Sequence, residues 1–89
     1  MRREGVMVFN EIERAWRIRI GDEFYETLPG MNLEIGIQHR YYEACFEIDY
    51  GDWFVTLEDD VDFSLRLVEE YKVLISEEEE LIPAFDLPF

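Results

Sequence analysis

The sequence predicts a mainly β domain, a small antiparallel barrel or roll of about six strands. Apolar and polar residues alternate in several short runs, as expected of half-buried strands whose successive side chains point to opposite faces. Turn-forming Gly, Pro and Asp residues separate these runs, and the connections are too short for crossover helices. The 89 residues make one small domain, and an apolar content of 48% excludes a disordered acidic chain.

Two strands are predicted in the first twenty residues. Residues 5–9 (GVMVF) form a short run rich in β-branched side chains, and residues 14–20 (RAWRIRI) alternate cleanly. The loop at residues 10–13 allows the two runs to pair. The alternation places Trp16, Ile18 and Ile20 inward and Arg17 and Arg19 outward.

The next segment combines a loop, a turn and a third strand. Residues 24–28 (FYETL) fit a loop that plugs one end of the core. Pro29–Gly30 predicts a turn, because Pro fixes its own φ and Gly supplies a positive φ. Residues 32–37 (NLEIGI) alternate as a strand, in which Gly36 indicates a bulge or a sharp bend.

The strongest local signal is a hairpin over residues 41–57 (YYEACFEIDYGDWFVTL). Two alternating runs flank a Gly-containing turn at residues 49–52, which is the pattern of paired antiparallel strands. The apolar side consists of Tyr42, Ala44, Phe46 and Ile48, followed by Trp53, Val55 and Leu57. This side is predicted to form the centre of the core.

Two readings remain open for residues 59–76. Perfect period-two alternation favours strands at 61–67 and 71–75, while the same apolar residues also fit a helix over 60–75. The acidic run at 76–80 is then solvated or disordered. We expect residues 1–80 to form the domain and the apolar residues 81–89 to form a tail.

The runs GVMVF, RAWRIRI, YETLPGMNLEI and YYEACFEIDYGDWFVTL together resemble a family of small, uncharacterised SH3-like barrel domains of Gram-positive bacteria and their mobile elements. In that family an acid-flanked apolar strand precedes a short turn and a Trp-Tyr-like pair, as Trp53–Phe54 does here. The resemblance spans residues 5–75 and implies an SH3-like barrel without implying an activity. This chain departs from the family by its stronger acidity and its tail.

The charge is strongly negative and unevenly placed. The net charge of −14 is almost entirely carried by residues 41–89, where Arg66 and Lys72 face fifteen acidic residues. Such a surface excludes ordinary binding to nucleic acid, which needs Lys and Arg to displace counterions. It favours a basic protein partner, and nucleic-acid-binding proteins are the commonest kind. Plain solvation of a small aromatic-rich domain is the competing interpretation.

The predicted partner-binding residues follow from the outward positions of the hairpin and its continuation. Aromatic side chains are frequent anchors in protein interfaces. The predicted acidic face consists of Glu43, Glu47, Asp49, Asp52, Glu58, Asp59, Asp60 and Asp62, with Tyr41, Tyr50 and Phe54 as aromatic anchors.

No pattern of residues indicates catalysis, a metal or a cofactor. Cys45 and His39 are the only nucleophile–imidazole pair, and nothing in their spacing forces contact. An EF-hand template beginning at Asp60 fails, because Leu65 stands where Gly is required and Tyr71 where the bidentate Glu belongs. We therefore expect a non-enzymatic protein without a cofactor.

The tail has two interpretations. Its end, FDLPF, loosely resembles peptides that dock on bacterial sliding clamps, with Phe85, Leu87 and Phe89 as the motif residues. Ala84 or Phe85 stands where those peptides carry glutamine, and a lid packed over the domain is the alternative.

The location expected from the sequence is cytoplasmic. The first residues lack the apolar core of a signal peptide, no apolar run reaches membrane-spanning length, and the single cysteine cannot form an internal disulfide. The predicted function is that of an acidic inhibitor of a nuclease or DNA-binding protein, encoded by a phage or mobile element. An adaptor that binds its partner through the barrel or the tail is the alternative, and a small hydrolase ranks third.

Overall fold

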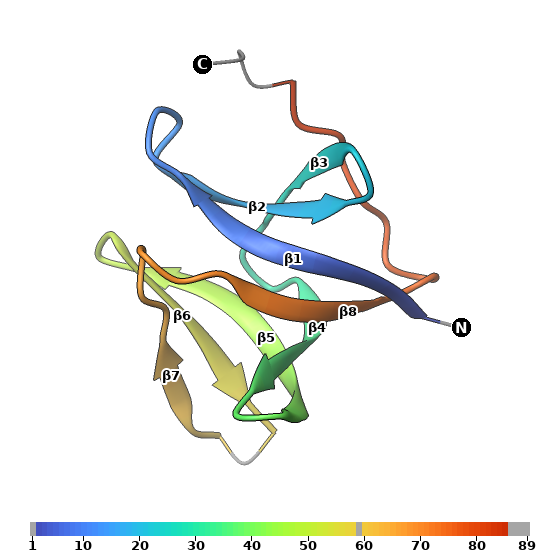
Figure 1. Cartoon of the computed structure of the whole chain (residues 1–89). Helices are drawn as coiled ribbons and strands as arrows, with labels where there is room; N and C mark the ends of the chain where they lie inside the picture. The colour runs from blue at the N-terminus through green and yellow to red at the C-terminus, as the bar shows by residue number, and fades with distance from the viewer. Residues whose placement is uncertain (1, 59, 86–89) are drawn as a thin grey trace.

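The computed structural model describes residues 2–58 and 60–85, and within them it contains one antiparallel sheet of eight strands (Figure 1). The order of the strands in the sheet is β3-β2-β1-β8-β4-β5-β6-β7. The strands are β1 (Arg2–Asn10), β2 (Ala15–Ile20), β3 (Glu23–Glu26), β4 (Asn32–Ile37), β5 (Arg40–Asp49), β6 (Asp52–Leu57), β7 (Asp62–Ser64) and β8 (Tyr71–Ser76).

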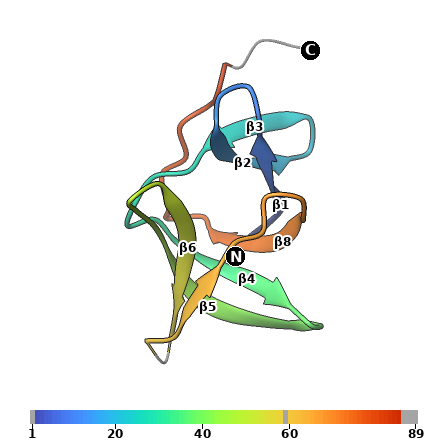
Figure 2. The same cartoon turned by 90° about the vertical axis from the view of Figure 1, so that its left-hand side faces the viewer.

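The sheet consists of two meanders joined by one strand. Strands β1 to β3 form the first meander and β4 to β7 form the second, each from neighbours in sequence. Strand β8 lies between them and pairs antiparallel with both β1 and β4. The sheet curls so that the meanders face each other, one above and one below β8 (Figure 2).

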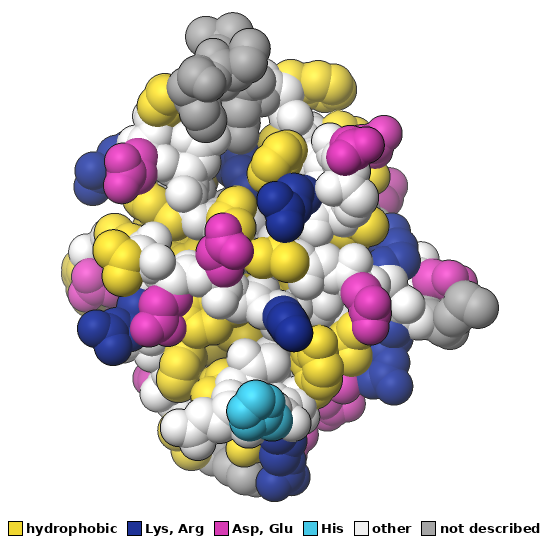
Figure 3. All heavy atoms as spheres, in the orientation of Figure 1, with side chains coloured by type: hydrophobic (Ala, Val, Ile, Leu, Met, Phe, Trp, Pro, Cys, Tyr) yellow, Lys and Arg dark blue, Asp and Glu magenta, His cyan; other side chains and the backbone are white. Residues whose placement is uncertain are grey.

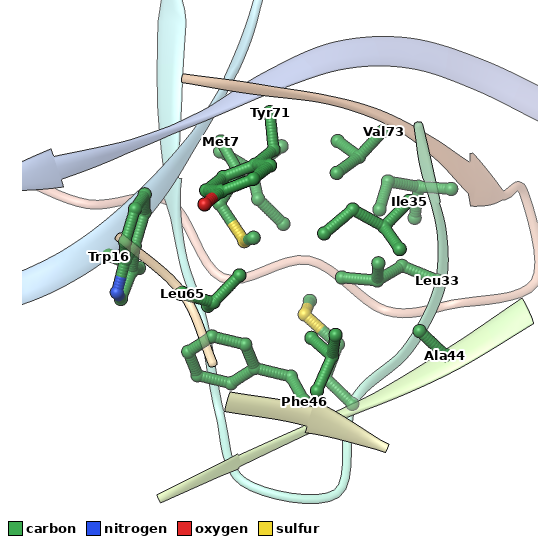
Figure 4. Packing of buried hydrophobic residues seen from close by; sticks show 13 residues of the cluster. Met7, Trp16, Leu33, Ile35, Ala44, Phe46, Leu65, Tyr71 and Val73 are labelled. Carbon is green, nitrogen blue, oxygen red and sulfur yellow. The ribbon is translucent and has the colours of Figure 1, made fainter. Parts of the chain in front are cut away.

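The space between the two meanders holds the hydrophobic core. Figure 4 shows Tyr71 and Val73 of β8 pointing toward Phe46 and Ala44 of β5. An aromatic chain runs along one side of the core, with ring centroids 5.6 Å apart for Phe9–Trp16 and 5.8 Å apart for Trp16–Tyr71. The largest side chains with an exposed fraction below 2% are Trp16, Phe46, Met7, Ile18, Ile35, Ile75, Val55 and Val73.

The predicted hairpin is confirmed with its turn. Strands β5 and β6 pair from Ala44↔Leu57 to Asp49↔Asp52. Tyr50 and Gly51 both have positive φ, 51° and 83°, which is the geometry of the type I′ turn that matches the twist of a hairpin. The predicted turn at Pro29–Gly30 is also confirmed, since the Met31 amide donates to the Leu28 carbonyl over 3.0 Å.

The predicted closure into a barrel is wrong, and the sheet stays open. Strands β3 and β7 are its two edges and do not pair with each other. Strand β7 has only three residues, and residues 82–84 of the tail pair with the edge of β3 that faces away from β2. The sheet also has eight strands where about six were predicted, and one that was not predicted is the edge strand β3, which takes in residues 24–26 of the predicted plug.

The alternative of a helix over 60–75 is also wrong, since the described residues contain strands and turns but no helix. The predicted strand at 61–67 shortens to β7. The Leu65 amide makes the last bond to β6, donating to the Trp53 carbonyl over 3.1 Å, and a turn then follows. That turn is closed by the Glu69 amide and the Arg66 carbonyl at 3.0 Å.

Two smaller expectations change in detail. Gly36 is not at a bulge, because it pairs in register with Tyr41. Its place in the strand allows the close approach of β8, since a Cβ there would lie 3.3 Å from the Lys72 carbonyl oxygen. Arg17 points away from the core as predicted, yet it is only 8% exposed.

Candidate interaction surface

The outer face of strands β5, β6 and β7 carries five of the predicted acidic residues, Glu43, Glu47, Asp49, Asp52 and Asp62. Side chains alternate along each strand, so burial of Ala44, Phe46 and Val55 turns their neighbours outward. The register places Asp49 directly opposite Asp52 and Glu47 opposite Phe54. Asp62 lies opposite Thr56, whose hydroxyl donates to its carboxylate over 3.2 Å. We call this surface the acidic face.

A groove of about 560 Å³ continues the acidic face toward β4 and β8. Cys45 and Thr56 are among the outward residues that line it. Its acidic lining consists of Glu34, Glu43, Glu58, Asp60 and Glu79. The predicted Glu43, Glu58 and Asp60 are thus brought together at one hollow, and Glu34 and Glu79 join them.

Sequence reasoning missed Glu34, Glu79 and the single base among the groove residues, Arg2. Glu34 lies directly opposite Glu43 in the β4–β5 register. The Arg2 guanidinium donates to the Glu34 carboxylate, which raises the pKa of Arg2. Outward alternation along residues 32–37 was a signal for Glu34. Nothing local to Arg2 indicated that β1 would reach this groove through β8.

The aromatic candidates are not equivalent. Tyr50 is 99% exposed at the tip of the β5–β6 turn, while Phe54 is half-buried on the acidic face. Tyr41 lies elsewhere: its ring packs near Gly36, and it lines a second hollow of about 350 Å³ together with Arg19 and Lys72. Tyr50 and Phe54 therefore belong to the acidic face, and Tyr41 does not.

The charge on the outer side of the sheet is polarised. Beyond β4, the exposed outward positions of β1, β2 and β8 include the bases Arg19 and Lys72 and the acid Glu4, while Arg2 of β1 lines the groove. In the view of Figure 3, basic and acidic side chains are interspersed with hydrophobic surface. At the described strand positions, the outer side of β5 to β7 thus carries acids without bases, whereas the outer side of β1, β2 and β8 carries both signs.

Cys45 and His39 are not brought into a catalytic pair. The Cys45 thiol lies 3.6 Å from a carboxylate oxygen of Glu47, and His39 occupies the exposed turn before β5 with φ 69°. Burial, and then the Glu47 charge, raises the pKa of the Cys45 thiol, which opposes formation of a nucleophilic thiolate. Among the described residues, no three His, Cys, Asp or Glu side chains are grouped to hold a metal ion.

The tail motif lies only partly within the structure. Phe85 is 91% exposed. Asp59, Leu87 and Phe89, which were also predicted as binding residues, lie outside the described residues.

Comparison of the chain with protein-family models, with curated proteins and with solved structures finds no match. The resemblance to SH3-like barrel domains stays a prediction. Within the described residues, no helix has the length and apolar character needed to span a membrane.

Proposed function

We propose that this chain is a non-enzymatic acidic protein that inhibits a nuclease or DNA-binding protein by occupying its basic nucleic-acid-binding surface. A phage or mobile element is the proposed source, with a role against host defence or in immunity. The acidic face presents its carboxylates at strand spacing, and the groove adds Glu58, Asp60 and Glu79 from turns. A basic cleft built for phosphates is complementary to such an array.

The observation that carries the proposal is the direct opposition of like charges. Asp49 lies opposite Asp52, and Glu34 lies opposite Glu43. Like charges directly opposite in an antiparallel pair are destabilising, and Arg2 offsets only the second pair. Solubility requires no such opposition, since scattered acids give the same net charge. A partner that supplies Lys and Arg removes the repulsion on binding.

The tip of the β5–β6 turn supports the same function. Tyr50 has φ 51° in a position that favours Asn, Asp or Gly, and its side chain is 99% exposed. A large aromatic residue therefore occupies a costly position without packing against this chain. Departures from local preference of this kind are expected at functional sites. Tyr50 is the proposed aromatic anchor beside Asp49 and Asp52.

Binding to purified nucleases and basic DNA-binding proteins, measured by biolayer interferometry at about 0.05 M and about 0.5 M salt, tests the proposal. The test variant carries Glu43→Gln, Glu47→Gln, Asp49→Asn and Asp52→Asn. The control variant carries Glu4→Gln, Glu11→Gln, Glu13→Gln and Asp22→Asn, four exposed acids in the first meander and its turns. Both variants change the net charge by the same amount, so they separate position from total charge.

The wild type and the control variant are expected to bind tightly at low salt and weakly at high salt. The test variant is expected to lose about 30-fold in affinity. Each exposed charge at the interface contributes roughly 0.5 kcal/mol, so four of them contribute about 2 kcal/mol. Nuclease inhibition is measured in parallel with the same proteins. Equal losses in both variants, or binding that is indifferent to salt, would contradict the proposal.

An adaptor that holds its partner by apolar contacts is the second candidate. Val68 is 89% exposed at the turn before β8, and Phe85 is 91% exposed. Binding by this route would survive high salt, so the same salt series separates the two functions.

A further inference from the structure

The tail is attached to the sheet as an additional, short strand. The Glu26 amide of β3 donates to the Ile82 carbonyl over 2.8 Å, and the Ala84 amide donates to the Phe24 carbonyl over 2.9 Å. Between these bonds, Tyr25 and Pro83 lie opposite each other as an antiparallel pair. Figures 1 and 2 both show the tail running beside β3. We call residues 81–85 the strap.

The position of Pro83 suits a strand that ends the sheet. In the pair Tyr25↔Pro83 the two flanking residues make the hydrogen bonds, so the backbone nitrogen of Pro83 faces away from β3. Pro has no N–H to offer a further strand, and proteins use Pro on edge strands for this reason. The strap therefore pairs with the edge of β3, and its Pro83 hinders the addition of a further strand to the sheet.

The strap is lightly held by side chains. Leu81 packs against the core as a partly buried residue, whereas Ile82 remains 44% exposed and Phe85 91% exposed. Phe24 on the β3 side is 41% exposed as well. Two half-buried side chains, Leu81 and Ala84, and two backbone bonds hold the strap, whereas β8 pairs along its length with β1 and also pairs with β4. Sparse contacts of this kind favour local opening.

The turn that leads into the strap also favours opening. Residues 77–80 are four consecutive glutamates, and like charges this close repel and extend a chain. Arg3 holds the turn by donating to the carbonyl oxygens of Ser76 and Glu79, at 2.6 and 2.8 Å. Arg3 therefore bonds to the backbone of the turn, and these bonds do not neutralise the glutamate carboxylates.

We propose that the β3 edge is a second binding site, which takes an extended apolar segment of a partner protein in place of the strap. The incoming segment supplies a carbonyl to the Glu26 amide and an N–H to the Phe24 carbonyl, with a large aliphatic side chain at the position of Leu81. The strap is then a displaceable strand that regulates access to this edge. The proposal is independent of the acidic face.

A disulfide lock tests whether displacement is required. Tyr25 and Pro83 form a non-hydrogen-bonded pair, whose Cα spacing of about 4.5 Å falls within the range of disulfides. The locked protein carries Tyr25→Cys and Pro83→Cys, with Cys45→Ser to remove the native thiol. The same protein after reduction is its matched control. Leu81→Ser in the full chain gives a loosened strap.

Amide hydrogen exchange is the first readout. In the wild type, the amides of Glu26 and Ala84 are expected to exchange at least about 100-fold faster than those of β8. Oxidation of the locked protein is expected to slow both by at least about 10-fold relative to its reduced form. Strap amides protected as strongly as β8 in the wild type would overturn the proposal.

The second readout uses an acetylated peptide with the sequence of residues 80–85 (ELIPAF), titrated by NMR. The tethered strap has an effective concentration in the millimolar range, so the peptide is used at about 1 mM and above. Peptide affinity is expected to rise from the oxidised to the reduced to the loosened protein, by at least about 10-fold across the series. Equal shifts in the oxidised and reduced forms would place the peptide elsewhere and overturn the proposal.

Discussion

Replacement of Gly5 by Ala is a sharp test of how the first meander is packed. Gly5 lies in β1 opposite Val73 of β8, where the backbone of β2 comes close. A Cβ at this position would lie 2.9 Å from the Arg19 carbonyl oxygen, 3.0 Å from Ile20 Cγ1 and 3.2 Å from Ile18 Cγ2. The first of these atoms belongs to the paired backbone, which cannot rotate away.

The expected cost follows from two opposing effects. Forcing an extra methyl into a packed site costs about 1–3 kcal/mol. Loss of glycine freedom in the unfolded chain returns about 0.4–1 kcal/mol. A net destabilisation of about 1–2 kcal/mol lowers the melting temperature of a domain of this size by roughly 5–15 °C.

Thermal unfolding followed by circular dichroism measures this shift. Gly36→Ala is the matched control, because a Cβ there would meet the Lys72 carbonyl oxygen at 3.3 Å and the movable Tyr41 ring at 3.4 Å. Its loss of stability is expected to be smaller. An unchanged melting temperature for Gly5→Ala, or a larger loss for Gly36→Ala, would refute the packing argument.

Three further predictions concern single side chains. Burial raises the pKa of Tyr71 above its usual value near 10, so the folded state keeps its proton longer than the unfolded state, and stability should fall as pH rises above about 10. Denaturant unfolding should show this fall in the wild type and a weaker one in Tyr71→Phe. The raised pKa of Cys45 predicts alkylation by iodoacetamide at pH 8 more slowly than a free cysteine peptide, and Glu47→Gln should speed the reaction. Tyr50→Asn should stabilise the type I′ turn by about 0.5–1 kcal/mol while weakening binding of the proposed partner, and unchanged binding would remove Tyr50 as an anchor.

Local pattern was enough to find most of the strands, because each depends on residues near in sequence. The alternation over 41–57 and the turn at 49–52 specify the hairpin without help from the rest of the chain. The sequence could not settle where β7 ends, since Leu65 continues the alternation while its amide makes the last bond to Trp53. It also could not show that the sheet stays open. The pairing of residues 82–84 with β3 was equally out of reach, because it is a contact across more than fifty residues.

The acidic face was predictable for the same reason as the hairpin. Outward alternation identifies Glu47, Asp49 and Asp52 once β5 and β6 are paired. The groove was not predictable, because Arg2, Glu34 and Glu79 reach it from different strands and a turn. The prediction of Tyr41 in the same surface was wrong. Tyr41 lies on the outer side of the sheet as predicted, but its position along β5 places it beside Gly36 and away from the groove.

The place of β8 between two meanders sets the order in which the molecule can assemble. Each meander closes only short loops, so its strands can associate early and quickly. The pairing of Arg2 with Ser76 instead joins residues more than seventy positions apart, and the Glu34↔Leu74 pair needs the same strand. On the ribosome, both halves of the core therefore remain exposed until residues 71–76 have emerged. Nascent chains stopped before Tyr71 should accordingly bind chaperones, and chains extended past Ser76 should release them in one cooperative step.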